Sequence, residues 1–173
     1  TCTNGVMTVK NGKTEVSEVK HPGEKIKEIL KEYNKKIVLP FDAIVGKKYD
    51  DNYVVSKDIN KLSNDEIIGD IGPKTLKVYK KIIDESKTIF MNGTAGIYEE
   101  AKFSNGTLEL LNIVTSSSAK TIAGGGDCIG AIDKFNMADK FTYISTGGGA
   151  TLEYIINETL PAIATISDKE EVL

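Results

Sequence analysis

The most informative absence in this sequence is arginine, because all 22 of its basic residues are lysine. An enzyme that transfers a phosphoryl group usually stabilises the transition state with a planar, bidentate cation, which arginine supplies. If this chain serves such chemistry, we expect the arginine to come from another chain or domain. A lysine can supply the charge, although only as a point charge.

Cysteine, long apolar runs and excess positive charge are also scarce. Cys2 and Cys128 are too few for a disulfide framework and predict a reducing, cytoplasmic environment. The apolar runs are far shorter than the roughly 20 residues of a membrane-spanning helix, and no secretory signal is recognisable. The net charge of -3 gives no basic footprint for nucleic acid. We therefore expect neither a membrane nor a nucleic acid among its partners.

The sequence is richest in glycine between residues 119 and 151, where one design occurs twice. An apolar run at 120–123 leads into Gly124-Gly125-Gly126-Asp127 and then a helical pattern to Phe135. A second run at 141–145 leads into Thr146-Gly147-Gly148-Gly149 and a helical pattern to Ile156. Strand, glycine turn and helix in this order are typical of parallel α/β units. Because free N–H groups and the helix dipole converge at such turns, both are candidate anion sites.

The rest of the chain predicts further strands and helices. Helical periodicity covers 22–36 and 103–115, and a loop at 69–75 opens a further helix that runs to about residue 86. Apolar runs at 37–45 and 88–91 predict buried parallel strands, of which the first is interrupted by Pro40 and Asp42 and is expected to end early. Weaker patterns predict short strands at 6–9 and 53–56, with Asn11-Gly12 as a hairpin turn after the first. We expect at least four strand–helix units in one sheet. The predicted fold is a three-layer α/β sandwich with a mainly parallel, Rossmann-like sheet, and residues 1–173 form a single domain.

Four blocks of residues, in this order, resemble the C-terminal half of phosphoglycerate kinases: Leu39 to Asp42; Asp70 to Thr75; Asn92 to Glu99; and Gly124 to Asp127 followed by Ser145 to Ala150. The last two are very specific in combination. Phe90-Met91-Asn92-Gly93 is more similar to the archaeal branch of that family. The resemblance runs from about residue 25 to about residue 165, and the family's opening glycine–lysine segment is not recognisable before Pro22.

The resemblance implies a two-domain hinge enzyme of which this chain holds part of the nucleotide half. The family's C-terminal half binds Mg–ADP or Mg–ATP, and its N-terminal half binds 3-phosphoglycerate with basic residues that include arginine. The two halves together move a phosphoryl group between 1,3-bisphosphoglycerate and ADP. The chain alone is therefore expected to be inactive, and a sheet edge left exposed by missing elements could be covered by dimerisation.

The resemblance also implies roles for individual residues. Asp127 would bind the magnesium ion, as suits an ion held by few carboxylates, phosphate oxygens and water. Glu99 would hydrogen-bond the ribose near Asn92, and Ile97 would pack on the adenine. The remaining nucleotide contacts would come from Gly124, Gly125, Gly126, Cys128, Gly147, Gly148 and Gly149. Among these, Gly125 and Gly126 would give backbone N–H groups to the nucleotide phosphates, and Gly147 to Gly149 would face the transferring phosphoryl group. The residues expected to act in catalysis are Gly125, Gly126 and Gly148.

Three residues depart from the family pattern. Cys128 stands where a threonine or serine is usual, which removes a hydroxyl contact to phosphate. Thr94 replaces a proline, and Gly69 lies one residue nearer to Asp70 than the glycine of the adenine pocket. In the first turn of a helix, Cys128 is either a small packed side chain or a thiol of lowered pKa.

Two other functions fit parts of the pattern. A free-standing nucleotide- or anion-binding module without catalysis would use the same glycine turns. A dinucleotide-dependent oxidoreductase is suggested by Gly124-x-Gly126-x-x-x-Gly130, but that fingerprint belongs at the first strand of its fold. The acidic residue expected about 20 positions later is also lacking. Taken alone, Asp127 could be a helix cap and the glycines could simply permit tight turns.

Overall fold

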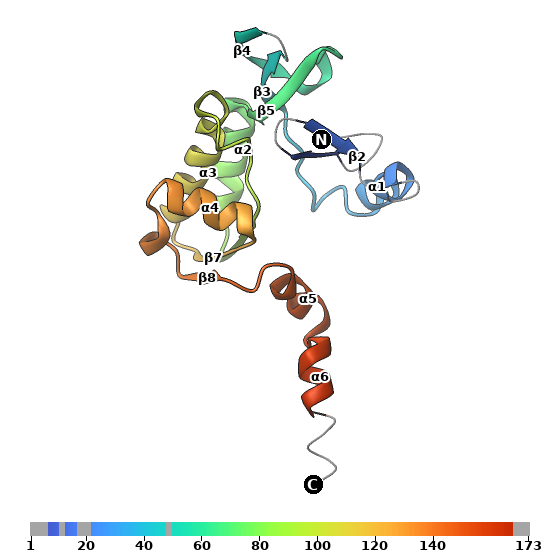
Figure 1. The fold of residues 1–173 in the computed structure, drawn as a ribbon, viewed down its shortest axis with the longest axis vertical. Helices are drawn as coiled ribbons and strands as arrows, with labels where there is room; N and C mark the ends of the chain where they lie inside the picture. Colours follow the sequence, from blue (N-terminus) through green and yellow to red (C-terminus); the bar gives the residue numbers. More distant parts are fainter. Residues whose placement is uncertain (1–6, 11–12, 17–21, 48–49, 168–173) are drawn as a thin grey trace. The chain divides into compact units, whose positions relative to one another are not determined.

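The computed structural model describes residues 7–10, 13–16, 22–47 and 50–167 (Figure 1). The chain divides into two compact units: unit 1 comprises Thr1–Lys81 and Ala95–Leu110, and unit 2 comprises Ile82–Thr94 and Leu111–Leu173. Each unit is considered by itself. Among the helices of the described residues, none combines the length and the apolar character that crossing a bilayer requires.

Unit 1 contains two small antiparallel sheets and helices. The first sheet pairs β1 (Met7–Lys10) with β2 (Lys13–Val16), so the strand expected at 6–9 is found, whereas the expected turn Asn11-Gly12 lies outside the described residues. The second sheet has the order β4-β3-β5 (Figure 1). Its strands are β3 (Asp42–Lys47), β4 (Asp50–Asp58) and β5 (Glu66–Ile71). The helices of unit 1 are α1 (Pro22–Glu32) and the first parts of α2 (Pro73–Asp84) and α3 (Asn105–Thr115).

The strand predicted at 37–45 is the main correction to the sequence-based fold. Residues 37–40 form no strand, and β3 begins only at Asp42 and pairs antiparallel with both neighbours. A parallel neighbour would need a crossover of about a dozen residues or more, whereas β4 begins at Asp50, soon after β3 ends at Lys47. The expectation of four strand–helix units in one parallel sheet is therefore wrong.

Unit 2 contains the parallel sheet, with the order β6-β7-β8. Its strands are β6 (Thr88–Asn92), β7 (Lys120–Gly124) and β8 (Tyr143–Ser145), and its helices are α4 (Gly126–Lys134), α5 (Gly149–Asn157) and α6 (Pro161–Ser167). Helix α4 packs against β7. The predicted α/β class and the strand–turn–helix units around both glycine runs are confirmed, while β5 and α6 were not predicted.

The core of unit 2 follows from the apolar residues of these elements. Ala123 of β7 and Ala131 and Ile132 of α4 have no exposed surface. Small side chains at two of these positions allow α4 to lie close to the sheet. The sheet and α4 together therefore fix the glycine turn that joins them, which is the first of the two candidate anion sites.

In unit 1 a buried carboxylate joins β3 to α2. Asp42 is 1% exposed and lies next to the first turn of α2, although Pro73, the first residue of that helix, is 31 positions later in the sequence. Its carboxylate accepts hydrogen bonds from the backbone N–H of Lys74 at 3.0 Å and of Thr75 at 2.8 Å, and from the Thr75 hydroxyl at 2.7 Å. Burial acts to raise the pKa of Asp42, but these hydrogen bonds outweigh it and hold the pKa below its usual value.

Candidate functional site

The carboxyl ends of the three parallel strands of unit 2 lie side by side. In the register of the sheet, Asn92 at the end of β6 pairs with Gly124 at the end of β7, and Gly124 pairs with Ser145 at the end of β8. Ligands of open α/β sheets bind outside these ends. The sequence-predicted residues Asn92 and Gly124 and the two glycine turns are thus brought to one edge.

The first glycine turn begins helix α4. Gly125 precedes the helix with φ +89°, a conformation that residues with a side chain rarely adopt. A Cβ atom at this position would lie 2.7 Å from Asn92 Oδ1, so the turn also needs glycine for space. Gly126 has no neighbouring atom within 4 Å of a would-be Cβ, and Asp127 in the first turn of α4 is exposed. The start of α4 therefore presents open backbone and one carboxylate.

The second glycine turn begins helix α5. Gly148 precedes the helix with φ +52°, and a Cβ on Gly148 or Gly149 would meet nothing within 4 Å. The turn is fixed by Ser145, whose hydroxyl lies 2.5 Å from Thr151 Oγ1 and accepts a hydrogen bond from Gly147 N–H at 3.3 Å. Sequence analysis assigned no role to these two hydroxyl groups. In the sequence, the expected strand-to-helix turn between them was the only feature that pointed to these two hydroxyl groups.

Cys128 is a packed side chain. It has no exposed surface, its thiol donates to the carbonyl oxygen of Met91 at 3.7 Å, and burial raises its pKa. The alternative of a reactive thiol with a lowered pKa is therefore wrong. Any ligand contact of Cys128 would have to come from its backbone.

The two residues expected to contact the nucleoside, Ile97 and Glu99, lie in unit 1. Ile97 is partly exposed and Glu99 is exposed. The backbone of this segment is held by two hydrogen bonds: Gly96 N–H donates to Thr107 Oγ1 at 3.0 Å, and Ile97 N–H donates to the carbonyl oxygen of Gly69 at 2.8 Å. The segment therefore presents an apolar and an acidic side chain from an anchored backbone.

Asp70, in strand β5, lies beneath that segment and was not among the predicted site residues. Its side chain is 1% exposed and accepts hydrogen bonds from the N–H groups of Ile71 at 2.9 Å and Gly106 at 2.5 Å. A Cβ on Gly96 or on Gly106 would lie within 2.4 Å of Asp70 Oδ1. Burial raises the pKa of Asp70 to about 6 despite the two hydrogen bonds.

This raised pKa predicts a pH dependence of stability. The pKa of Asp70 in the folded state, about 6, lies above its value in the unfolded state. The stabilising contribution of Asp70 is therefore complete below about pH 4 and is lost as the pH rises towards 6 and beyond. We expect the free energy of unfolding of the wild type, relative to Asp70→Asn, to fall by on the order of 1 to 2 kcal/mol between pH 4 and pH 7. Urea denaturation followed by circular dichroism at several pH values measures this difference. A difference that is constant with pH would contradict the assignment.

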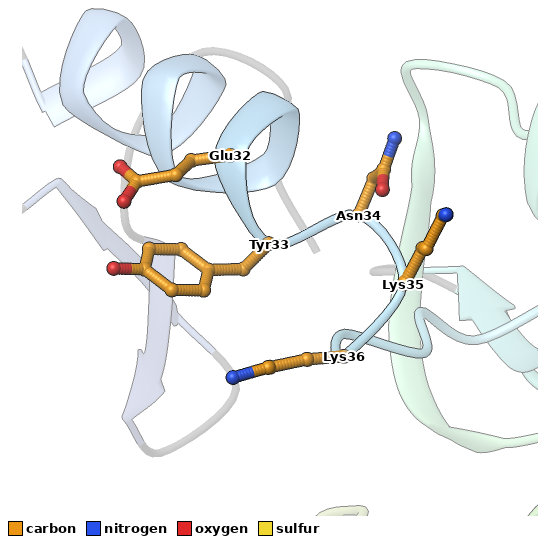
Figure 2. A pocket seen from close by; sticks show the side chains of 5 residues that line it. All are labelled: Glu32, Tyr33, Asn34, Lys35 and Lys36. Carbon is orange, nitrogen blue, oxygen red and sulfur yellow. The ribbon is translucent and has the colours of Figure 1, made fainter.

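A surface pocket of about 470 Å³ lies at the end of α1 and contains none of the predicted site residues. Figure 2 shows that Glu32, Tyr33 and Lys36 point to one side of the chain, whereas Asn34 and Lys35 point to the other. The Lys36 ammonium lies 5.9 Å from the centre of the Tyr33 ring, and a hydrogen bond with Glu32 raises the pKa of the Tyr33 hydroxyl. The pocket is formed by five consecutive residues, which begin at the last residue of α1.

No protein-only metal centre is apparent in the part of the chain that the structure describes, since no three His, Cys, Asp or Glu side chains gather there. Asp127 fits a different kind of cation site. Mg²⁺ commonly binds one or two carboxylates and takes its other ligands from phosphate oxygens and water. An exposed carboxylate in the first turn of α4, next to open backbone N–H groups, matches that donor set.

Over most of its length, the chain is similar to phosphoglycerate kinases. The model of the phosphoglycerate kinase family matches residues 3–158, and so begins earlier than the resemblance predicted. A phosphoglycerate kinase from Oenococcus oeni is 44% identical over 146 residues, which are 83% of this chain but 36% of that protein. The structure of phosphoglycerate kinase from Coxiella burnetii matches with a TM-score of 0.75 and 37% identity, over 87% of this chain and 39% of that chain. The structure of phosphoglycerate kinase from Pyrococcus horikoshii matches with a TM-score of 0.74 and 31% identity, over 87% of this chain and 37% of that chain. The chain thus spans well under half the length of these relatives.

Proposed function

Because the chain belongs to the phosphoglycerate kinase family, we propose that residues 1–173 form the Mg–ADP- and Mg–ATP-binding domain of such a kinase. The observation that carries the proposal is the pair of glycine turns at the ends of neighbouring strands β7 and β8. In the complete reaction, a phosphoryl group would pass between 1,3-bisphosphoglycerate and ADP. A cytoplasmic location accords with this function and stays a prediction.

The glycine turns would bind the phosphates through their backbone. Gly125 and Gly126 lie where the unpaired N–H groups of α4 and its positive dipole end converge, and Gly147 to Gly149 lie in the same position relative to α5. These groups would attract the negative charge of the phosphoryl oxygens during an in-line transfer. Gly125, Gly126 and Gly148 would be catalytic in this sense, because the reaction needs positioning and charge stabilisation rather than a protein nucleophile.

Asp127 would hold the magnesium ion next to these turns. The ion held there would supply positive charge to offset the negative charge that develops on the phosphate oxygens. In unit 1, Glu99 would accept a hydrogen bond from a ribose hydroxyl and Ile97 would pack on the adenine. Asn92 of unit 2, next to Gly125, would complete the list of nucleotide contacts, together with the backbone of Gly124 and Cys128.

The transfer itself would need groups that this chain lacks. It has no arginine, and the relatives are more than twice as long as the segment that matches. We propose that a further domain supplies the 3-phosphoglycerate side and the missing cation. Pairing of two chains through an edge strand of the parallel sheet, where β6 and β8 are the outer described strands, is a further prediction.

Asp127→Asn tests the assignment of the metal. The exchange keeps the size of the side chain and removes its charge, so we expect the affinity for Mg–ADP to fall by on the order of tenfold or more, while the affinity for ADP without magnesium stays the same or rises. Calorimetric titration measures both. Asp139→Asn is a matched control, because Asp139 is exposed in the short 3-10 helix Ala138–Lys140 of the same unit. Equal losses with and without magnesium would remove Asp127 from the metal site.

A free-standing binding module that never takes part in catalysis would use the same turns. It differs from the proposed kinase domain in its response to a partner. We expect that adding the N-terminal half of a relative, with 3-phosphoglycerate as acceptor and Mg–ATP as donor, would yield phosphoryl transfer only if the kinase proposal is right.

A further inference from the structure

Two backbone hydrogen bonds attach the segment that carries Ile97 and Glu99 to neighbouring elements of unit 1. Gly96 is linked to α3 by Thr107 Oγ1, and Ile97 is linked to β5 by the carbonyl oxygen of Gly69. Both anchors are backbone N–H groups of the segment itself. The position of Ile97 and Glu99 therefore depends on how β5 and the start of α3 are held together.

Asp70 holds these two elements together. From its place in β5, its carboxylate accepts the N–H of Gly106 in the first turn of α3 at 2.5 Å. Its Oδ1 atom also occupies the space next to Gly96, where a Cβ would lie 2.4 Å away. One side chain thus contacts β5, the start of α3 and the backbone of the segment.

The surroundings of Asp70 are closely packed. Phe103 is 5% exposed and covers Gly69, where a Cβ would lie 2.1 Å from Phe103 Cδ1. The carbonyl oxygen of Phe103 lies 2.6 Å from a would-be Cβ of Gly96. Glycine at 69, 96 and 106 lets three backbone segments approach the carboxylate and the ring. Asp70 cannot shift without displacing at least one of these segments.

We propose that Asp70, together with Thr107, is a positioning residue for nucleoside recognition: it fixes the backbone of residues 96–99 so that Ile97 and Glu99 face the base and the ribose. This inference rests on the proposed function, since it concerns the nucleoside end of the same ligand. Neither Asp70 nor Thr107 touches the nucleotide, because Asp70 is 1% exposed and Thr107 has no exposed surface.

Amide hydrogen exchange of the full chain, read by NMR, tests the anchoring directly. In Thr107→Val the hydroxyl that accepts the Gly96 N–H is lost at nearly constant volume, and in Asp70→Ala the carboxyl group that accepts the Gly106 N–H is lost. We expect the protection of the Gly96 and Ile97 amides to fall on the order of tenfold in both variants, which corresponds to the loss of one hydrogen bond. Thr107→Ser keeps the hydroxyl and is expected to restore most of the protection. Unchanged protection in Thr107→Val and Asp70→Ala would overturn the proposal.

Binding of two probes separates positioning from general destabilisation. We expect both variants to bind ADP on the order of tenfold more weakly than the wild type, while their affinity for magnesium tripolyphosphate, which has no nucleoside, stays within about twofold. A fall in both affinities by the same factor would show general destabilisation and contradict the proposal. If the wild type binds magnesium tripolyphosphate but not ADP, the proposed nucleotide function fails, and the exchange measurement still decides whether Asp70 and Thr107 anchor the segment. Asp139→Asn, in unit 2, serves as the control in both measurements.

Discussion

Replacing Asp42 by alanine is expected to lower the free energy of unfolding by about 3 kcal/mol. The carboxylate accepts three hydrogen bonds from Lys74 and Thr75 and is 1% exposed, so the variant leaves buried donors at the start of α2 without a partner. Because the pKa of Asp42 is lowered in the folded state, its stabilising effect is present above the unfolded value and is lost as the pH falls through the folded value. The difference from the wild type should therefore shrink below about pH 4.

Asp58→Ala is the matched control for this prediction. Asp58 caps the short 3-10 helix Ile59–Lys61 by accepting from Asn60 N–H at 2.9 Å, but this hydrogen bond is exposed to solvent. Water can replace that hydrogen bond, so we expect a loss of about 0.5 to 1 kcal/mol. Urea denaturation of both variants measures the two values. Equal losses at the buried and the exposed cap would contradict the argument from burial.

The two neighbouring glycines of the first turn are expected to respond differently to alanine. Gly125→Ala places a Cβ at φ +89° and 2.7 Å from Asn92 Oδ1, so we expect it to reduce stability by about 2 to 3 kcal/mol. Gly126→Ala meets no atom within 4 Å at the first residue of α4, and its effect on stability should be neutral or slightly favourable. Of these two glycines, only Gly125 is required by the fold.

Nucleotide binding, unlike stability, should be sensitive to the substitution of Gly126. If phosphate approaches the backbone there, the methyl group of Gly126→Ala occupies the approach, and the affinity for Mg–ADP should fall on the order of tenfold while stability is kept. Thermal unfolding and calorimetric titration of the same preparation give both quantities. Wild-type affinity in a folded Gly126→Ala variant would exclude phosphate from this turn.

The parts of the fold that sequence reasoning predicted are those fixed by local pattern. Apolar runs followed by glycine and a helical period gave β7 with α4 and β8 with α5, and α2 and α3 also follow their apolar faces. The glycine turn at Gly125 could be anticipated because only glycine suits a strand-to-helix turn with positive φ. The family and the α/β class were predicted for the same reason, since these motifs carry the resemblance.

The missed elements depend on contacts between distant residues. Gly69 and Asp70 suggested a loop, but Gly69 lies within β5 because Phe103, far away in the sequence, packs where its side chain would be. Asp42 suggested the end of a strand, whereas it starts β3 and caps α2 by accepting from the N–H of Thr75, 33 positions later. The antiparallel pairing of β3 could have been inferred from the short connection to β4, which is too brief for a parallel crossover.

Calorimetric titration of the purified chain with ADP, with and without magnesium, tests the central claim most directly. The claim is that the glycine turns and Asp127 form a site for a magnesium nucleotide that survives without the remaining part of the relatives' length. We predict saturable binding of ADP that is at least several-fold tighter with magnesium, as expected for an ion shared between one carboxylate and phosphate oxygens. Absence of binding under both conditions, by a chain shown to be folded, would contradict the account.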